Sequence, residues 1–326
     1  MMRETFLSED FRVSALGLGC SSMSHGYNPG DRDDEESIRV IRRAVDLGID
    51  LFDTADVYGP YTNEQLLGRA LHGSKGQVAS KCGLVPAPDG TLSRNGAPGH
   101  LRRACEGSLR RLGRETIDLY QLHRVDPAVP LEESWGALGE LVTEGKVRAL
   151  GISHATVEEL TRAHAVFPIT AVQYELSVWA TGNLTTVLPW CRRNGVGFLA
   201  FAPLGRGYLS GTVDRSGLDA SDSRSRDPRF APDAFRANQV IVEVLRAIAR
   251  RHEATPSQVA IAWVLAQGRD VVPIPGTRRL SWLEENVAAC DVQLTEEDFA
   301  QIAGLPTTTG EMGWDRDRFP TALEQR

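Results

Sequence analysis

The chain has 326 residues, with 36 Lys and Arg against 43 Asp and Glu, so its formal net charge is −7 at pH 7. A nucleic-acid partner needs a basic face to meet the phosphate backbone, and this balance argues against one. No apolar run is long enough to cross a bilayer, which argues against a membrane partner. The five cysteines (Cys20, Cys82, Cys105, Cys191 and Cys290) are scattered and never spaced as CxxC, which favours a reducing compartment and no structural zinc site. The first five residues also lack the features of a secretory signal, so we expect a soluble cytoplasmic protein.

The chain begins with two short apolar runs at 6–7 and 11–13, which predict a small hairpin. Residues 14–22 follow as a short strand that ends in small residues. Gly17-x-Gly19 invites comparison with a dinucleotide-binding fingerprint, but the third small residue is Ser22 and no helix begins there. We therefore reject a Rossmann fold, and we expect Tyr27 to lie in a loop at the mouth of a barrel.

From this point apolar strands alternate with helical patterns almost to the end of the chain. The eight strands are predicted at 14–22, 49–52, 77–80, 117–122, 147–152, 169–172, 197–200 and 271–274. Helices are predicted near 35–47, 63–71, 100–112, 131–144, 157–166, 184–194 and 280–289. Eight parallel strands with helices between them predict a (β/α)8 TIM barrel. Because no linker divides the chain, residues 1–326 are predicted to form one α/β domain.

Two segments depart from this alternation. Residues 203–235, after the seventh strand, form a connection that is too long for an ordinary loop and is rich in Gly, Ser, Asp and Arg. We expect 212–229 to be mobile without a cofactor and to close over its pyrophosphate, with Arg206 or an arginine of 224–229 completing the lid; the alternative is a surface insertion. The tail, 305–326, carries Met312, Trp314 and Phe319, which either pack on the barrel or contribute to a pocket.

Four polar side chains stand at or just beyond the ends of successive strands: Asp53, Tyr58, Lys81 and His123. The carboxyl ends of barrel strands converge on one face, so these four can meet. Taken singly, each has a structural explanation, such as a carboxylate that binds nearby amides or a half-buried turn tyrosine. Together they form a proton donor, because an ammonium near Tyr58 favours its phenolate, Asp53 can hold Lys81 charged, and His123 can orient a carbonyl oxygen. Such a site can protonate a carbonyl oxygen while a hydride donor adds a hydride to the carbonyl carbon.

Later strand ends predict where a nicotinamide cofactor binds. Ser153 and Gln173 offer donors and acceptors for a carboxamide, Phe201 offers a flat face for stacking, and 203–207 brings bare backbone close to a pyrophosphate. Gly276, Thr277, Arg278 and Arg279 precede a helix, which predicts a phosphate site at a helix N-terminus. Two arginines suit a monoester phosphate, so the sequence favours NADP over NAD. A basic surface turn is the alternative.

Several motifs in register resemble signatures of the aldo-keto reductase superfamily, across essentially the whole chain. They are 52–59 (FDTADVYG), 118–124 (DLYQLHR), 203–207 (PLGRG) and 273–278 (PIPGTR), and the branch most resembled is the bacterial and plant one that includes perakine reductase. The resemblance implies a (β/α)8 barrel that binds NADPH without a Rossmann domain or a metal, with Tyr58 as general acid. It also implies cofactor contacts from Ser153, Gln173, Phe201, Pro203, Leu204, Gly205, Gly207, Gly276, Thr277, Arg278, Glu285 and Asn286, of which Glu285 and Asn286 would hold the adenine.

Two positions depart from the family pattern. His154 stands where many members have asparagine, although it could still donate a hydrogen bond to the carboxamide. Trp282 stands where some relatives place arginine or glutamine near the adenosine, and it either stacks on the adenosine or merely covers it.

The favoured function is an NADPH-dependent reductase of aldehydes or ketones, and two alternatives remain. One is a catalytically weak NADPH-binding regulatory protein on the same fold, like the β subunits of potassium channels. The other, a barrel hydrolase, needs paired acids or metal ligands at the strand ends, and the sequence shows neither. Substrate choice is expected to depend on Tyr27, Trp179, the long loop and the tail, while the sequence leaves the substrate and the oligomeric state open.

Overall fold

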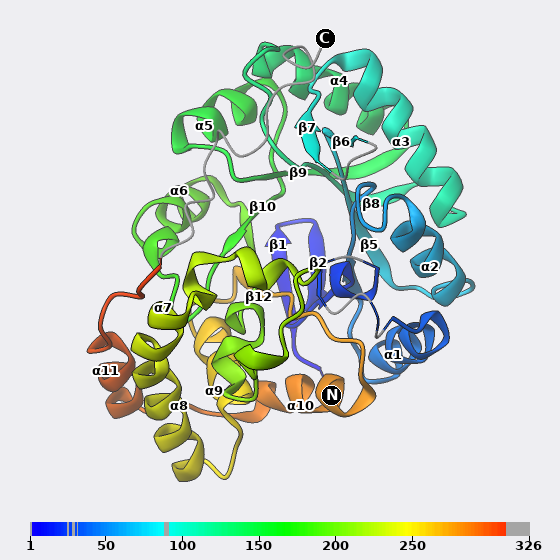
Figure 1. Ribbon diagram of the computed structural model, residues 1–326. Coiled ribbons are helices and arrows are strands. Elements are labelled where there is room, and N and C mark those ends of the chain that lie inside the picture. The colour runs from blue at the N-terminus through cyan, green and yellow to red at the C-terminus, as the bar shows by residue number, and fades with distance from the viewer. Residues whose placement is uncertain (1, 25, 28–29, 31, 88–90, 311–326) are drawn as a thin grey trace.

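The structure, a computed structural model, describes residues 2–24, 26–27, 30, 32–87 and 91–310. An eight-stranded parallel sheet forms its centre, and helices surround the sheet (Figure 1). The sheet order is β12-β11-β10-β9-β8-β5-β4-β3. These strands are β3 (Leu18–Gly19), β4 (Leu51–Asp53), β5 (Gln77–Cys82), β8 (Ile117–Leu122), β9 (Val147–Ser153), β10 (Ala171–Glu175), β11 (Gly197–Phe201) and β12 (Val271–Pro273).

The two edges of this sheet meet and close a barrel. Gly19, at the end of β3, forms a parallel bridge with Gly276, which follows β12. The Gly19 backbone N–H donates to Pro275 O at 3.1 Å. A Cβ on Gly19 would lie 2.7 Å from Ile274 O, so only glycine lets the two edges approach this closely. The predicted (β/α)8 barrel is confirmed.

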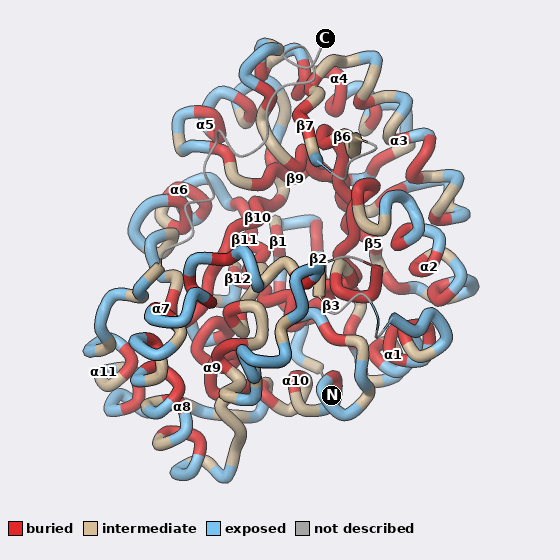
Figure 2. The backbone as a smooth tube through the Cα atoms, in the orientation of Figure 1, coloured by how far each residue is buried: buried red, intermediate tan, exposed pale blue. Residues whose placement is uncertain are grey.

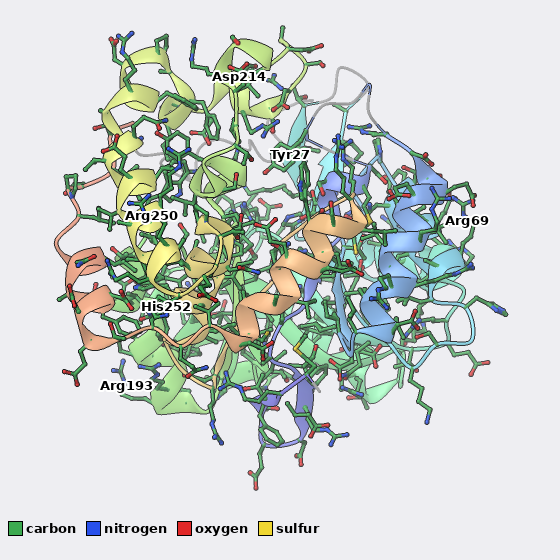
Figure 3. The ribbon with its side chains drawn as sticks, turned by 90° about the horizontal axis from the view of Figure 1, so that it is seen from below. Tyr27, Arg69, Arg193, Asp214, Arg250 and His252 are labelled. Atoms are coloured by element: carbon green, nitrogen blue, oxygen red, sulfur yellow. The ribbon has the colours of Figure 1, made fainter. Side chains whose placement is uncertain are left out.

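Inward-facing residues form an apolar layer at one end of the barrel, and the predicted N-terminal hairpin covers it. The hairpin pairs β1 (Glu4–Ser8) with β2 (Phe11–Ser14) in antiparallel fashion. One buried cluster joins its side chains to the barrel interior: Leu7, Phe11, Val13, Leu51, Ala79, Leu119, Ala149, Ala171, Leu199 and Val272. Because side chains alternate along a strand, the next inward position of each strand lies one layer closer to the carboxyl ends. Figure 3 shows Tyr27 and Asp214 at the end of the molecule away from this hairpin.

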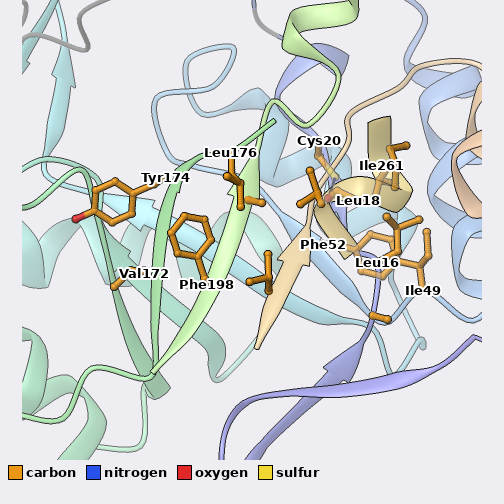
Figure 4. Close-up of a cluster of buried hydrophobic side chains, with 14 of the residues drawn as sticks. Leu16, Leu18, Cys20, Ile49, Phe52, Val172, Tyr174, Leu176, Phe198 and Ile261 are labelled. Carbon is orange, nitrogen blue, oxygen red and sulfur yellow. Dashed lines mark hydrogen bonds between the residues drawn. The ribbon is translucent and has the colours of Figure 1, made fainter. Parts of the chain in front are cut away.

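Helices cover the outside of the barrel, and their buried faces are turned toward it (Figure 2). They are α1 (Asp34–Asp46), α2 (Thr62–Ala70), α3 (Pro98–Leu112), α4 (Leu131–Thr143), α5 (Val157–Val166), α6 (Val187–Asn194), α7 (Pro232–Ala237), α8 (Gln239–Arg251), α9 (Pro256–Leu265), α10 (Leu280–Ala288) and α11 (Glu296–Ala303). Outward-facing strand residues such as Phe52, Val172 and Phe198 belong to the main buried core (Figure 4). The strongest amphipathic patterns, in α1 and α8, fit helices that lie on this surface.

The structure adds elements that the sequence pattern did not predict. The Gly- and Pro-rich segment after β5 forms a second hairpin, β6 (Leu84–Pro86) with β7 (Leu92–Arg94). Helices α8, α9 and α11 were not predicted. The segment 203–235 is not one structureless loop, because it contains four 3₁₀ turns and the start of α7. Met312, Trp314 and Phe319 of the predicted tail lie outside the described residues.

Candidate active site

A layer of polar side chains lies directly above the apolar layer of the barrel. Asp53, at the end of β4, is its centre. Lys81 Nζ, from β5, donates to Asp53 Oδ1 at 2.6 Å and to Thr54 O at 2.7 Å. Two amides hold the other carboxylate oxygen: Gln173 Nε2 donates to Asp53 Oδ2 at 2.7 Å and Gln121 Nε2 donates to it at 3.2 Å. All of these side chains are buried, so the charged pair is surrounded by hydrogen-bond donors in place of water.

Tyr58 and His123 lie next to this pair. Tyr58 is half-buried on the loop after β4, and Lys81 Nζ is 5.2 Å from the centre of its ring. The rings of Tyr58 and His123 meet edge to face, with centroids 5.9 Å apart. His123 follows β8, and its backbone N–H donates to Cys82 O at 2.8 Å. The structure therefore brings together all four of the residues that the strand ends predict.

The pKa of Tyr58 is raised above its ordinary value of 10.0, chiefly because burial disfavours the phenolate. Lys81 acts in the opposite direction, through its charge and a hydrogen bond to the tyrosine hydroxyl. We predicted the direction of the Lys81 effect, but burial outweighs it. Burial would also lower the pKa of Lys81, but Asp53 and Tyr58 more than offset this, so the pKa of Lys81 is raised. Tyr58 is therefore protonated and Lys81 charged at neutral pH.

The loop that carries Tyr58 is fixed by buried polar contacts from α2. Thr54 Oγ1 donates to Asn63 Oδ1 at 2.6 Å, and Asn63 Nδ2 donates to Cys20 O at 2.9 Å.

Tyr61 adopts a left-handed conformation with φ of 69° just before α2 begins. Of five non-glycine residues with positive φ in the described chain, four lie on loops at this end of the strands: Tyr61, His154, Ala202 and Arg206. Strained backbone of this kind gathers at functional sites.

Two residues that support the site, Gln121 and Asn63, were given no role by sequence reasoning. Gln121 stands two positions before His123 on β8, so the strand period places its side chain inside the barrel in the layer below. This period is the signal that could have identified it. Asn63 gives no such signal, because it lies in the first turn of α2, where asparagine is common.

The residues predicted to hold the nicotinamide line the same end of the barrel. Ser153 Oγ donates to Gln173 O at 3.0 Å and accepts from Arg124 at 3.3 Å. His154, with φ of 55°, places its ring 5.3 Å from that of Phe201. Burial, followed by the nearby charge of Arg124, lowers the pKa of His154 well below 6.5, so its ring is neutral at pH 7.

Ion pairs, together with buried residues such as Tyr208 and Phe230, hold the segment after β11 in place. Arg229 bridges Glu175, at the end of β10, at 2.6 Å and Asp227 at 3.3 Å. Arg206 pairs with Asp227 at 3.4 Å, and Arg224 with Asp222 at 2.8 Å. The sequence predicts that 212–229 is mobile without a cofactor, yet Asp222, Asp227 and Arg229 within it are buried.

Trp179 packs against this segment. The guanidinium of Arg229 lies 4.6 Å from the centre of the Trp179 ring, and that ring stacks on Tyr208. Gly205 comes so close that a Cβ there would lie 2.5 Å from Trp179. Pro203 and Gly205 are buried, whereas Leu204 and Gly207 are half-buried. The guanidinium of Arg224 lies 5.0 Å from the ring of Tyr27, so Tyr27 faces the same segment.

A cavity of about 270 Å³ opens at the start of α10, lined by Arg278, Arg279, Asp33 and Glu36. Gly276, two residues before Arg278, packs against the end of β3: a Cβ on Gly276 would lie 2.8 Å from Gly19 O and 3.4 Å from Ser22 Oγ. Ser22 Oγ is buried and has no hydrogen-bond partner among the described residues. Arg279, the N-cap of α10, makes no side-chain cap, while Thr277 Oγ1 accepts from the Arg279 backbone N–H. Two arginines at a helix start with an unpartnered hydroxyl suit an anion.

The three positions further along α10 differ in exposure. Trp282 is 50% exposed, with the guanidinium of Arg279 4.9 Å from its ring centre. Asn286 is buried. Glu285 Oε1 accepts from Thr255 Oγ1 at 2.6 Å, so its carboxylate is joined to the N-cap of α9. In the described part of the chain no group of three or more His, Cys, Asp or Glu could hold a metal ion.

Comparison with known proteins agrees with this geometry. Residues 15–306 match the Aldo/keto reductase family. The chain is 42% identical over 298 residues to "Probable aldo-keto reductase 1" of Glycine max, covering 90% of this chain and 86% of that protein. These matches show that the chain belongs to the aldo-keto reductase family, a family of oxidoreductases.

Two solved structures share the fold. A glycerol dehydrogenase from Gluconobacter oxydans has a TM-score of 0.84 and 31% identity over 93% of both chains. A thermostable aldo-keto reductase solved with the inhibitor epalrestat has a TM-score of 0.75 and 28% identity over 94% of this chain and all of that one. No helix among the described residues is long and apolar enough to span a membrane.

Proposed function

We propose that this protein is an NADPH-dependent reductase of aldehydes or ketones in which Tyr58 donates the proton. The observation that carries the proposal is the contact of Tyr58 with Lys81 and His123, above a carboxylate that holds Lys81. A protonated hydroxyl next to a charged ammonium is the arrangement that general acid catalysis needs.

The residues present also fit the cofactor. The cavity at Arg278 and Arg279 suits a phosphate monoester, and the buried Ser22 hydroxyl next to Gly276 offers a further donor. Asp33 and Glu36, which also line the cavity, would repel the same phosphate, so the arginines must outweigh them. Ser153, His154 and Gln173 would hold the carboxamide next to Phe201. Pro203, Leu204, Gly205 and Gly207 would border the pyrophosphate, and Thr277, Trp282, Glu285 and Asn286 the adenosine phosphate and adenine.

The chemistry then divides between cofactor and protein. When bound, NADPH supplies the hydride that adds to the carbonyl carbon. Tyr58 gives its proton to the carbonyl oxygen, which His123 orients. The ammonium of Lys81 stabilises the phenolate that remains on Tyr58, and Asp53 keeps Lys81 charged and in place.

A panel of carbonyl substrates tests this proposal. Aldehydes and ketones are mixed with the protein and NADPH, and the loss of nicotinamide absorbance is followed. Because one structural relative is a glycerol dehydrogenase, small polyols with NADP should be included for the reverse reaction. We expect turnover with at least one carbonyl class. Tight NADPH binding with no turnover across the panel would instead support a regulatory NADPH-binding protein.

A further inference from the structure

We propose that Gln121 is a positioning residue of the catalytic site, which fixes the Asp53 carboxylate and through it the ammonium of Lys81. Its side chain is completely buried, and its amide N–H donates to Asp53 Oδ2 at 3.2 Å. Its amide oxygen accepts from Gln173 Nε2 at 3.4 Å. Gln121 therefore joins the carboxylate and the glutamine next to it in one network.

The Lys81 ammonium has three hydrogens, and this hydrogen-bond network determines the acceptor to which each one is donated. One goes to Asp53 Oδ1 and one to Thr54 O, which leaves the third for the hydroxyl of Tyr58. The Thr54 carbonyl is fixed by backbone. The Asp53 carboxylate can rotate, and the amides on Oδ2 prevent it from doing so. A rotation would move Oδ1 away from Lys81 and turn the third hydrogen away from Tyr58.

Barrel packing gives independent support. Gly151 on β9 stands opposite Gln121 in the strand register. A Cβ on Gly151 would lie 2.8 Å from Gln121 Cγ and 3.0 Å from Ala171 O. Gly151 is not among the glycines with positive φ, so its backbone conformation does not require glycine. The missing side chain makes room for Gln121.

Gln121 matters most when the cofactor is bound, a point that rests on the proposed function. Gln173 Nε2 supplies the shorter bond to Asp53, yet Gln173 is also proposed to hold the carboxamide. If its amide turns toward that group, Gln121 is the amide that remains on Asp53 Oδ2.

The first test follows the ionisation of Tyr58 in the protein without cofactor, so it does not depend on turnover. Tyrosines carrying ¹³C at Cζ are titrated by NMR, and the Tyr58 signal is assigned by its loss in Tyr58→Phe. The charged or titratable groups that face Tyr58 and its partners are Asp53, Lys81, His123, Arg124 and Cys20. Since a well-placed ammonium favours the phenolate, Gln121→Met should move the Tyr58 titration to higher pH by on the order of half a pH unit.

The control is Tyr120→Phe, which removes a buried polar atom from the neighbouring position on β8 but belongs to the outer core. It should leave the Tyr58 titration where it is. An unchanged titration in Gln121→Met, with the protein folded by circular dichroism, would overturn the proposal whether or not the protein reduces carbonyls.

The second test uses turnover at several pH values. Gln121→Glu retains shape but replaces the amide donor by a carboxyl, which can donate to Asp53 only when protonated. Buried next to another carboxylate, such a group keeps its proton to higher pH than it would in water. At high pH, its kcat should therefore be about tenfold to a hundredfold below that of wild type. This deficit should shrink as the pH falls and the carboxyl gains its proton. Gln121→Met should show a similar deficit at every pH. Parallel pH profiles for the two variants would contradict a donor role.

Discussion

The two oxygens of Asp53 have different partners, and these partners explain how a carboxylate can be buried inside the barrel above its apolar layer. Lys81 neutralises Oδ1, while the amides of Gln121 and Gln173 satisfy Oδ2. A buried ion pair is stable only when its remaining lone pairs and protons find partners. Here the chain supplies both, so Tyr58 lies next to a fixed positive charge.

At the same scale, Arg278 is proposed to decide the choice of cofactor. Arg278→Ala should weaken NADPH binding by about one to two orders of magnitude, because a charged hydrogen bond contributes roughly 1.5–3 kcal/mol. NADH, which lacks the phosphate, should be affected much less. Fluorescence titration with both cofactors measures the effect. Arg193→Ala, on the exposed side of α6, is the matched control (Figure 3). Equal losses for both cofactors would mean that Arg278 acts elsewhere, with Arg279 the next candidate.

Gly151 permits a prediction about stability. Gly151→Ala should lower the free energy of unfolding by roughly 1–3 kcal/mol, because its Cβ meets Gln121 and a strand carbonyl in a packed barrel. Gly136→Ala, on α4 where a Cβ would only touch Val166 Cγ1 at 4.0 Å, should be neutral or stabilising by up to about 1 kcal/mol. Urea unfolding of both variants measures the difference. Similar stabilities for the two would show that the contact at Gly151 relaxes without cost.

At the scale of elements, the segment after β11 combines fixed and exposed parts. Asp222, Asp227 and Arg229 are buried, whereas most residues from 214 to 221 are exposed. The ion pair of Arg229 with Glu175 joins residues 222–229 to the barrel. This anchoring could not be predicted, because a sequence rich in Asp and Arg does not show which charges will pair.

We still expect 212–229 to become more protected when NADPH binds. Exposed, polar segments gain order only when a ligand offsets their entropy. Hydrogen exchange with and without NADPH measures this, and residues 131–143 of α4 serve as an internal control. If protection across 212–229 does not change, the segment is a surface insertion that does not contact the cofactor.

Helix α11 permits a prediction about pH. Burial alone would raise the pKa of Asp298, but the backbone N–H of Thr295 and the side chains of Arg251 and His252 hold it well below 3.8. A carboxyl whose pKa is lower in the folded state stabilises the protein above its unfolded pKa and loses that effect as the pH falls. Asp298→Asn should therefore cost roughly 1–3 kcal/mol at pH 7, and less below pH 3.8.

Denaturant unfolding of wild type and Asp298→Asn, at pH 7 and at a pH below 3.8, measures this cost. Glu297→Gln, at an exposed position on the same helix, should cost little at either pH. A cost that is the same at both pH values would show that the charge of Asp298 is not what stabilises α11.

At the scale of the whole molecule, the barrel explains why part of the site could be predicted. Strand ends converge on one face whatever the details of packing, so Asp53, Lys81 and His123 could be brought together from strand positions alone. The same strand period could have placed Gln121 inside the barrel, but its partner could not be predicted, because that depends on which neighbour its amide meets across the barrel. Helix α9 escaped prediction because it is buried on nearly every side and has no amphipathic period. The β6–β7 hairpin lies in a segment whose Gly and Pro content indicated only loop.

The central claim is that Tyr58 supplies the proton in a carbonyl reduction by NADPH. Its most direct test compares wild type with Tyr58→Phe by measuring NADPH affinity and kcat on the best substrate of the panel. We predict unchanged NADPH binding and a fall in kcat of about 10²–10⁴-fold, the usual contribution of general acid catalysis. Near-normal kcat in Tyr58→Phe would contradict the account and assign the proton to another group.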